Sequence, residues 1–301
     1  MTNQNNSDTD NQEDELNLIE IYNQLIIKKT VIFTVTSLFF LAGVIYSLLL
    51  PTIYTSNSQL TSVSSSGQTS GPSSQLGGLA AIAGLNLGTA GGDKATISVE
   101  TIKSRDFFRH LITFENIPQL LYAPIYDSNS KQTFIDPAAY DVLKKQWLID
   151  EPSFLNLYFQ YRAMMTVYQD KRGFVYISVA HQSPVFAAEF LTLIIDEVNN
   201  LTRIRDLEES QSSLNYLYNQ LGNTQVSDIR VAINQLIESQ LKKQMLANVK
   251  KYYTLQPLDT AYIPEIKTSP QRRNITILFS IAGFLLSLLF ILARFYLFSK
   301  K

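Results

Sequence analysis

Two long runs of uncharged, apolar residues stand near the ends of the sequence, and they constrain the fold more than any other feature. The first run is residues 31–50 and the second is residues 275–293. At 1.5 Å of rise per residue, a helix of this length crosses a hydrocarbon core of roughly 30 Å. A cleaved signal peptide needs a basic leader and a shorter apolar core, whereas the charged residues before the first run are mostly acidic. A buried core helix rarely contains so long an uncharged run, so we predict two transmembrane helices.

Basic residues beside the two runs predict the orientation of the chain. Lys28 and Lys29 precede the first run, and Arg294 follows the second. Because lysine and arginine near the ends of spans tend to stay in the cytoplasm, both termini are expected there and the central region outside. The predicted organisation is a cytoplasmic tail at 1–30, a first span at 31–50, an outer domain at 51–274, a second span at 275–293 and a cytoplasmic tail at 294–301.

The outer domain carries both strand and helix patterns. Residues 54–61 and 255–263 read as a first and a last strand that begin and end beside the membrane, so they could pair in one sheet. Residues 164–168 and 174–180 predict a β-hairpin, in which Val175, Ile177 and Val179 share a face. The remaining expectations are a Ser/Gly/Ala-rich loop at 62–92, an amphipathic helix at 96–114 and an irregular region at 118–152 with a short helix from Ala138.

A helical arm is expected at 184–252. Ser183 and Pro184 provide a cap and a first-turn proline for a long helix, and Gly222 and Asn223 mark a break before a returning helix. Some 35 residues per helix would give an arm of roughly 50 Å. Its apolar stripe could be buried within the helix pair or could pack against neighbouring copies, and the pattern leaves both interpretations open. The stripe residues are Leu201, Ile204, Leu207, Leu214, Leu217, Leu221, Ile233, Leu236 and Leu241.

Composition and motifs favour no catalytic chemistry. The net charge is −1, which does not suit a nucleic-acid partner, and the absence of cysteine excludes disulfides and thiolate metal sites. No phosphate loop and no common hydrolase or metalloprotease motif is present, so no catalytic residue, metal ligand or cofactor is predicted. Asp136, Asp150 and Glu151 could form the carboxylate pair of a membrane-anchored glycan hydrolase, although solvated loop charges are commoner.

The second span and its outer edge contain two candidate contact surfaces. Arg272 and Arg273 could bind the phosphates of lipids or of a lipid-linked sugar chain, or could simply extend to lipid headgroups. Ser280, Gly283 and Ser287 form a small-residue face that would let another transmembrane helix approach closely.

Four segments resemble the Wzz-type chain-length determinants, also called polysaccharide co-polymerases. They are residues 14–33, 47–60, 170–199 and 258–294, and they follow the order of the family. The resemblance implies a membrane α+β fold: two transmembrane helices flanking a periplasmic α+β base with a long, extended helical hairpin arm. The resemblance also gives Pro270 and the small-residue face around Gly283 as motif positions, and it makes them, with Arg272 and Arg273, candidates for contact with lipid phosphate or with a polymerase. A fused tyrosine kinase, which some members carry, is not expected here.

The resemblance further implies a function and partners. Members are ring-like homo-oligomers in the bacterial inner membrane that regulate the chain length of a surface polysaccharide, such as O-antigen. The implied partners are other copies of the chain, a polysaccharide polymerase and the lipid-linked polysaccharide. The alternative is a two-span envelope sensor or ligand-binding scaffold, which is disfavoured because few residues lie on the cytoplasmic side of the spans.

Overall fold

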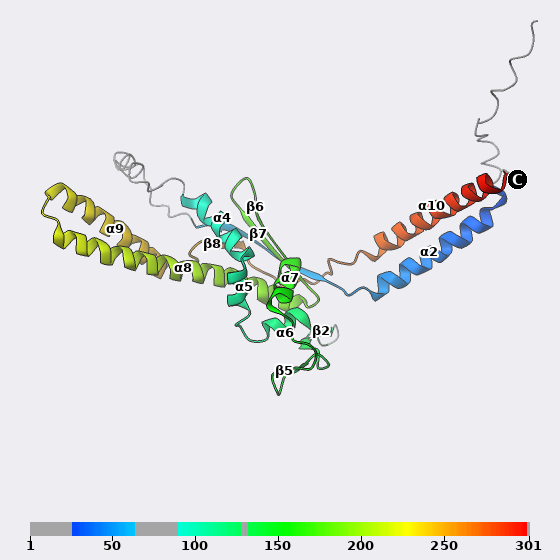
Figure 1. The fold of residues 1–301 in the computed structure, drawn as a ribbon, viewed down its shortest axis with the longest axis horizontal. Coiled ribbons are helices and arrows are strands. Elements are labelled where there is room, and N and C mark those ends of the chain that lie inside the picture. Colours follow the sequence, from blue (N-terminus) through cyan, green and yellow to red (C-terminus); the bar gives the residue numbers. More distant parts are fainter. Residues whose placement is uncertain (1–25, 64–89, 128–129, 131, 300–301) are drawn as a thin grey trace, which may run out of the picture. The chain divides into compact units, whose positions relative to one another are not determined.

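The computed structural model describes residues 26–63, 90–127, 130 and 132–299, and the chain divides into two compact units. The helix-pair unit comprises residues 1–52 and 268–301. The sheet-and-arm unit comprises residues 53–267. Figure 1 shows the elements of both units.

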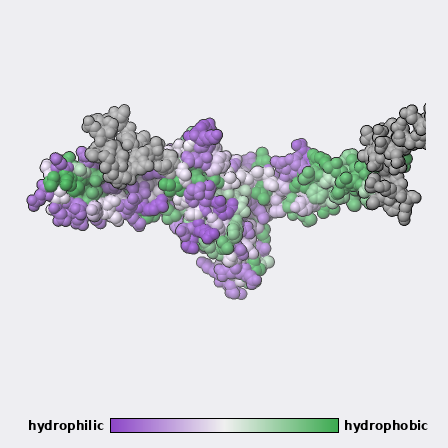
Figure 2. All heavy atoms as spheres, turned by 45° about the horizontal axis from the view of Figure 1, so that its top comes forward, coloured by the Kyte–Doolittle hydropathy of each residue, from purple (hydrophilic) through white to green (hydrophobic). Residues whose placement is uncertain are grey.

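The helix-pair unit consists of α2 (Lys29–Leu49) and α10 (Arg272–Ser299). Both are long and apolar enough to cross a membrane, and only 11% and 17% of their most apolar stretches are buried. A core helix of a soluble protein would be mostly buried, so these exposed apolar surfaces suit a lipid environment. Figure 2 shows the same hydrophobic surface over this unit. The second helix begins at Arg272, three residues before the predicted start of the span.

A four-stranded antiparallel sheet forms the base of the sheet-and-arm unit. Its strands are β1 (Tyr54–Ser62), β6 (Met165–Gln169), β7 (Val175–His181) and β8 (Leu255–Asp259), in the order β6-β7-β1-β8. The predicted hairpin is therefore confirmed, as is the pairing of the first and last strands. The last strand ends at Asp259 rather than at the predicted residue 263.

The core lies between the sheet and the helices that cover it. Val175, Ile177 and Val179 are fully buried, which confirms the predicted inner face of β7. They pack in one cluster with apolar side chains from the first half of α8 (Pro184–Asn223), among them Phe190 and Ile194. Helices α4 (Ala90–Lys103), α5 (Arg105–Leu111) and α7 (Phe154–Met164) contribute further side chains to this cluster, as do β1, β6 and β8.

The predicted single helix at 96–114 is wrong, because the chain forms two helices that meet at Ser104. The Oγ atom of Ser104 accepts a hydrogen bond from the backbone N–H of Phe107 at 3.1 Å and so caps α5. The last carbonyls of α4 are satisfied from α7, since Tyr158 and Tyr161 donate hydrogen bonds to the carbonyls of residues 103 and 102, each at 2.7 Å.

Two other expectations for this part of the chain were incorrect. The loop predicted at 62–92 is shorter at both ends, because Ser62 belongs to β1 and α4 begins at Ala90; its residues 64–89 lie outside the described ranges. The region 118–152 is less irregular than predicted, and no helix begins at Ala138. It contains α6 (Ile117–Tyr122), β2 (Pro124–Asp127), β3 (Gln132–Ile135), β4 (Tyr140–Asp141) and β5 (Gln146–Trp147).

Helices α8 and α9 (Ser227–Val249) run side by side as the predicted helical hairpin (Figure 1). Ser183 caps α8 as expected, since its Oγ atom accepts from the N–H of Phe186 at 3.1 Å. The turn falls at residues 224–226, slightly later than predicted. The first part of α8, through Val198, belongs to the core of the base. The predicted arm at 184–252 is therefore too long, and we use "arm" below for residues 202–249.

Candidate functional surfaces

The two apolar helices meet through two reciprocal contacts between phenylalanine and glycine. A Cβ atom placed on Gly283 would lie 2.5 Å from the Cβ of Phe39, and one placed on Gly43 would lie 2.7 Å from the Cβ of Phe279. Residues with a side chain cannot approach so closely, so glycine is required at both positions. Because 39 pairs with 283 and 43 with 279, the helices are antiparallel. The end of α2 and the start of α10 therefore lie at the same end of the pair.

The predicted small-residue face of α10 is occupied by the chain's own first apolar helix. Gly283 and Ser287 are buried in the helix-pair unit, and Ser280 is partly buried. The hydroxyls of Ser280 and Ser287 donate to backbone carbonyls of α10, at 2.8 and 2.7 Å. Both serine hydroxyls therefore already have hydrogen-bond partners within α10. The close approach that glycine allows is used within the chain.

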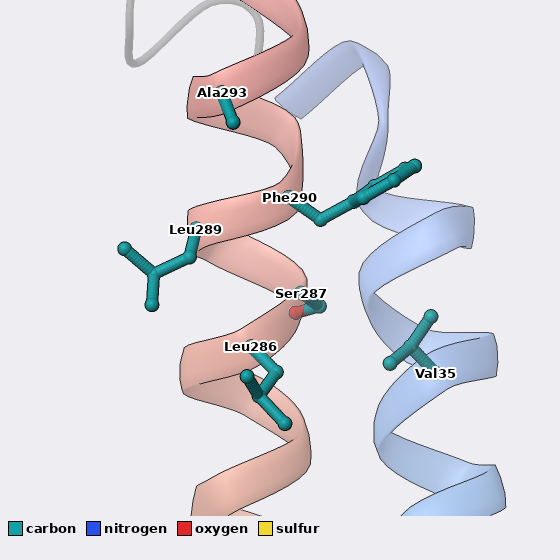
Figure 3. A pocket seen from close by; sticks show the side chains of 6 residues that line it. All are labelled: Val35, Leu286, Ser287, Leu289, Phe290 and Ala293. Carbon is teal, nitrogen blue, oxygen red and sulfur yellow. The ribbon is translucent and has the colours of Figure 1, made fainter.

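An open hollow lies beside the contact between α2 and α10, which we call the seam. Figure 3 shows Val35 of α2 facing Ser287 and Phe290 across it, with Leu286, Leu289 and Ala293 on the α10 side. Its lining is almost entirely hydrocarbon, and its one hydroxyl is the Ser287 group that donates to Phe284. Such a surface suits an acyl chain or another apolar helix and offers no group for proton transfer.

Arg272 and Arg273 lie in the first turn of α10 rather than before the helix. Arg273 is exposed, while Arg272 is partly buried and its Nε–H lacks a hydrogen-bond partner among the described residues. The backbone N–H of Arg272 donates to the carbonyl of the buried Pro270 at 3.0 Å. The N-terminus of a helix carries partial positive charge, so two added cations there repel it and an anion would relieve the repulsion.

The arm is held together by a short apolar cluster and a buried polar contact. Leu214, Ile233 and Ile237 are buried between α8 and α9, with Leu217 and Leu221 packed against them. Ser210 is fully buried, and its hydroxyl contacts the backbone carbonyl and side-chain oxygen of Gln240 at 3.1 and 3.0 Å. Part of the predicted apolar stripe is thus buried between α8 and α9.

The rest of the predicted stripe has other surroundings. Leu201 packs on the core of the base, and Leu207 is partly buried. Ile204, Leu236 and Leu241 are exposed. The structure therefore divides the stripe between the two interpretations that the sequence left open: one part packs inside the arm, and the three exposed residues remain available to another surface.

Asn199 joins α8 to the last strand, and no sequence pattern indicated it. Its side chain is buried, and its Oδ1 atom accepts from the backbone N–H groups of Tyr253, Thr254 and Leu255 at 2.8–3.0 Å. Its Nδ2 atom donates to the carbonyls of Ile195 and Leu255 at 2.8 and 2.9 Å. One amide thus fixes the chain where it returns from the arm to the sheet.

Charged residues surround the root of the arm. The Arg203 guanidinium donates to the carbonyls of Lys250 and Lys251 at 2.8 and 2.6 Å, close to the end of α9. Asp206 accepts a hydrogen bond from the Tyr253 hydroxyl at 2.6 Å and lies within 3.8 Å of the ammonium groups of Lys94 and Lys243. Burial, together with the neighbouring carboxylate, raises the pKa of Tyr253.

The two histidines have ordinary structural partners. His110 lies 2.6 Å from a carboxylate oxygen of Glu197. His181 is buried: its Nε2 atom lies 3.0 Å from the Leu120 carbonyl, and its Nδ1 atom accepts from the Ser183 N–H at 3.1 Å. These contacts define a neutral ring protonated on Nε2, and burial lowers the pKa of His181 to about 4.

The three acidic residues considered as a hydrolase site either accept a local backbone hydrogen bond or are exposed to solvent. The Asp136 carboxylate accepts from the Ala138 N–H at 2.8 Å, as in a local turn, and Asp150 and Glu151 are exposed. Among the residues that the structure describes, no group of three or more His, Cys, Asp or Glu is placed to hold a metal ion.

The chain thus combines a pair of antiparallel apolar helices, near its two ends in sequence, with an α+β base that carries a helical arm. These features suit a membrane-anchored protein. Comparison with known families adds a more specific relationship: residues 14–113 match the model of the family described as chain length determinant protein, Wzz. This confirms the predicted resemblance for the segments at 14–33 and 47–60. The matched segment contains α2, β1, α4 and α5.

Further comparisons concern whole proteins. No curated protein matches the chain. Among solved structures, a "full-length bacterial polysaccharide co-polymerase" is similar over 95% of this chain and 99% of its own length, with 12% sequence identity and a TM-score of 0.41.

Proposed function

We propose that this protein regulates the chain length of a bacterial surface polysaccharide, such as O-antigen or a related glycan, without catalysing a reaction. The observation that carries the proposal is the match of residues 14–113 to the chain length determinant family. The two apolar helices and the helical arm are the parts that a membrane-anchored scaffold beside a polymerase would need.

The proposed topology places both termini in the cytoplasm and residues 51–274 in the periplasm. The antiparallel helix pair supports it, because both connections to the sheet-and-arm unit leave the same end of the pair. Lys28 and Lys29 stand at the opposite end, as expected for a cytoplasmic side. Reporter fusions at the two ends and at the arm turn would test this topology; activity of a cytoplasmic reporter at the turn would contradict it.

In the proposed assembly, copies of the chain associate as a homo-oligomer and contact the polymerase and its lipid-linked polysaccharide. The exposed residues Ile204, Leu236 and Leu241 are candidates for contact between arms. The lipid-facing side chains of α2 and α10, together with the hollow beside their seam, are candidates for contact with the polymerase.

Deletion of the gene tests the function directly. We expect the modal length of the polysaccharide to change on a gel and the original distribution to return when the gene is restored. An unaltered ladder in the deletion strain would refute the proposal.

Arg272 and Arg273 test the proposed contact with phosphate. Replacing both by alanine should shorten or broaden the length distribution, because the start of α10 would lose the cations that face lipid or lipid-linked phosphate. Replacing both by lysine retains the charge and is the matched control. Equal distributions for the wild-type and the double-alanine protein, at equal protein levels, would exclude this role.

A further inference from the structure

Residues 262–267, which we call the juxtamembrane segment, expose apolar side chains. Tyr262 is 53% exposed, Ile263 is 55% exposed and Ile266 is 82% exposed, whereas Pro264 between them is buried. The carbonyl of Tyr262 accepts a 2.7 Å hydrogen bond from the hydroxyl of the buried Ser56. This hydrogen bond holds the first residue of the segment beside β1, and the two isoleucines that follow are exposed.

Chain length limits how far this segment can be from the ends of both apolar helices. Ser56 follows Leu49, the last residue of α2, by seven residues, and Ile266 precedes Arg272, the first residue of α10, by six. A fully extended chain spans at most ~3.6 Å per residue, so these links reach no more than roughly 25 and 22 Å. The same edge of the sheet-and-arm unit is tethered from both directions.

The residue types of the segment match the interface of a bilayer. Isoleucine is stable at the boundary of the acyl chains, tyrosine is enriched at the level of the headgroups, and the exposed Lys267 can reach lipid phosphates. Glu265, also exposed, must stay hydrated, which limits the depth of insertion. The combination suits shallow contact with a lipid surface.

We infer that the juxtamembrane segment is a lipid-binding element, in which Ile263 and Ile266 insert shallowly into the outer leaflet and Lys267 contacts headgroup phosphate. This contact sets the height of the sheet above the membrane. The inference rests on the proposed spanning of the bilayer by α2 and α10, and it assigns to residues 262–267 an anchoring function separate from those helices.

The absence of cysteine makes a direct test possible. Single-cysteine variants of the full-length chain would be labelled with an environment-sensitive fluorophore and reconstituted into vesicles of phosphatidylethanolamine and phosphatidylglycerol. The test site is Ile266→Cys. Leu143→Cys is the matched control, because Leu143 is an aliphatic residue of the same unit that is 97% exposed. Leu41→Cys, on the exposed face of α2, reports whether the span itself lies in lipid.

Two quenchers distinguish lipid from water and from protein. We expect lipids with a nitroxide near the headgroup to quench the label at position 266 strongly, and aqueous iodide to quench it weakly. The label at position 143 should show the reverse. Quenching by iodide alone at position 266 would overturn the inference, and protection from both quenchers would overturn it in favour of a contact with protein. Position 41 lies near the middle of α2, so a nitroxide in the middle of the acyl chain is the quencher for its label. If this lipid quenches position 41 and the headgroup nitroxide does not quench position 266, this inference alone fails; if neither position is quenched by lipid, the proposed span fails as well.

Discussion

Replacement of Asn199 by alanine should strongly destabilise the sheet-and-arm unit. The substitution leaves the backbone N–H groups of residues 253, 254 and 255 without their common acceptor inside the protein. An unsatisfied buried donor costs about 1–3 kcal/mol. Even at the lower limit, three of them give a loss of about 3 kcal/mol, a large part of the roughly 5–15 kcal/mol typical of a folded domain.

The assay is chemical unfolding of the full-length protein in detergent, followed by far-ultraviolet circular dichroism and by the emission of Trp147. That residue is the single tryptophan of the chain and belongs to the sheet-and-arm unit. Asn215→Ala is the matched control, because Asn215 also lies on α8 but is exposed and accepts a hydrogen bond from its helical neighbour Gln211 at 3.2 Å.

The expected result is a loss of about 3–5 kcal/mol for Asn199→Ala and a change within ~0.5 kcal/mol for Asn215→Ala. Equal unfolding midpoints for the two variants would refute the reasoning, since they would show that Asn199 does not support the return of the chain to the sheet. If the free energy of unfolding of Asn199→Ala depends less steeply on denaturant concentration than that of the wild type, the arm and the base no longer unfold together.

Two further predictions concern the helix seam and the buried histidine. Gly283→Leu should destabilise the helix pair by about 1–3 kcal/mol in thermal unfolding, because the new side chain meets the Cβ of Phe39; adding Phe39→Gly, which removes that Cβ, should recover part of the loss, and an equal loss in both backgrounds would contradict the contact. His181 has a pKa of about 4 in the folded protein and an ordinary value of 6.5, so the folded state binds fewer protons between these values. Its contribution to stability is complete above pH 6.5 and is lost, by about 3 kcal/mol, as the pH falls towards 4. In His181→Gln this pH dependence should be absent in urea titrations, and an unchanged dependence would show that another group is responsible.

The elements that could be predicted from the sequence are those with a strong local signal. The uncharged runs predict α2 and α10, alternation predicts the hairpin of β6 and β7, and Ser183 with Pro184 predicts the start of α8. In each case the chain's own periodicity or capping determines the structure. The pairing of β1 with β8 could also be predicted, because each of these strands lies next to one of the two predicted spans in the sequence.

Where contacts from distant residues decide the structure, the predictions were wrong or missing. The helix at 96–114 breaks at Ser104 because Tyr158 and Tyr161 bind the last carbonyls of α4, and the sequence gives no sign of that contact. The role of Asn199 also depends on distant residues, and nothing in the sequence around it distinguishes it from Asn200. Gly283 was identified as a site of close approach, but its partner Phe39 lies at the other end of the chain.

The position of β1 in the sheet affects the order in which the protein can fold during synthesis. Tyr54 pairs with His181 and Gln59 with Asp259, so β1 is made long before either of its neighbours, β7 and β8. One row of its backbone groups stays unpaired until β7 has been made, and the other row stays unpaired until β8 has been made. Such non-local pairing is slow and leaves strand edges free to bind other chains. Newly made copies would therefore need protection against aggregation until β8 arrives.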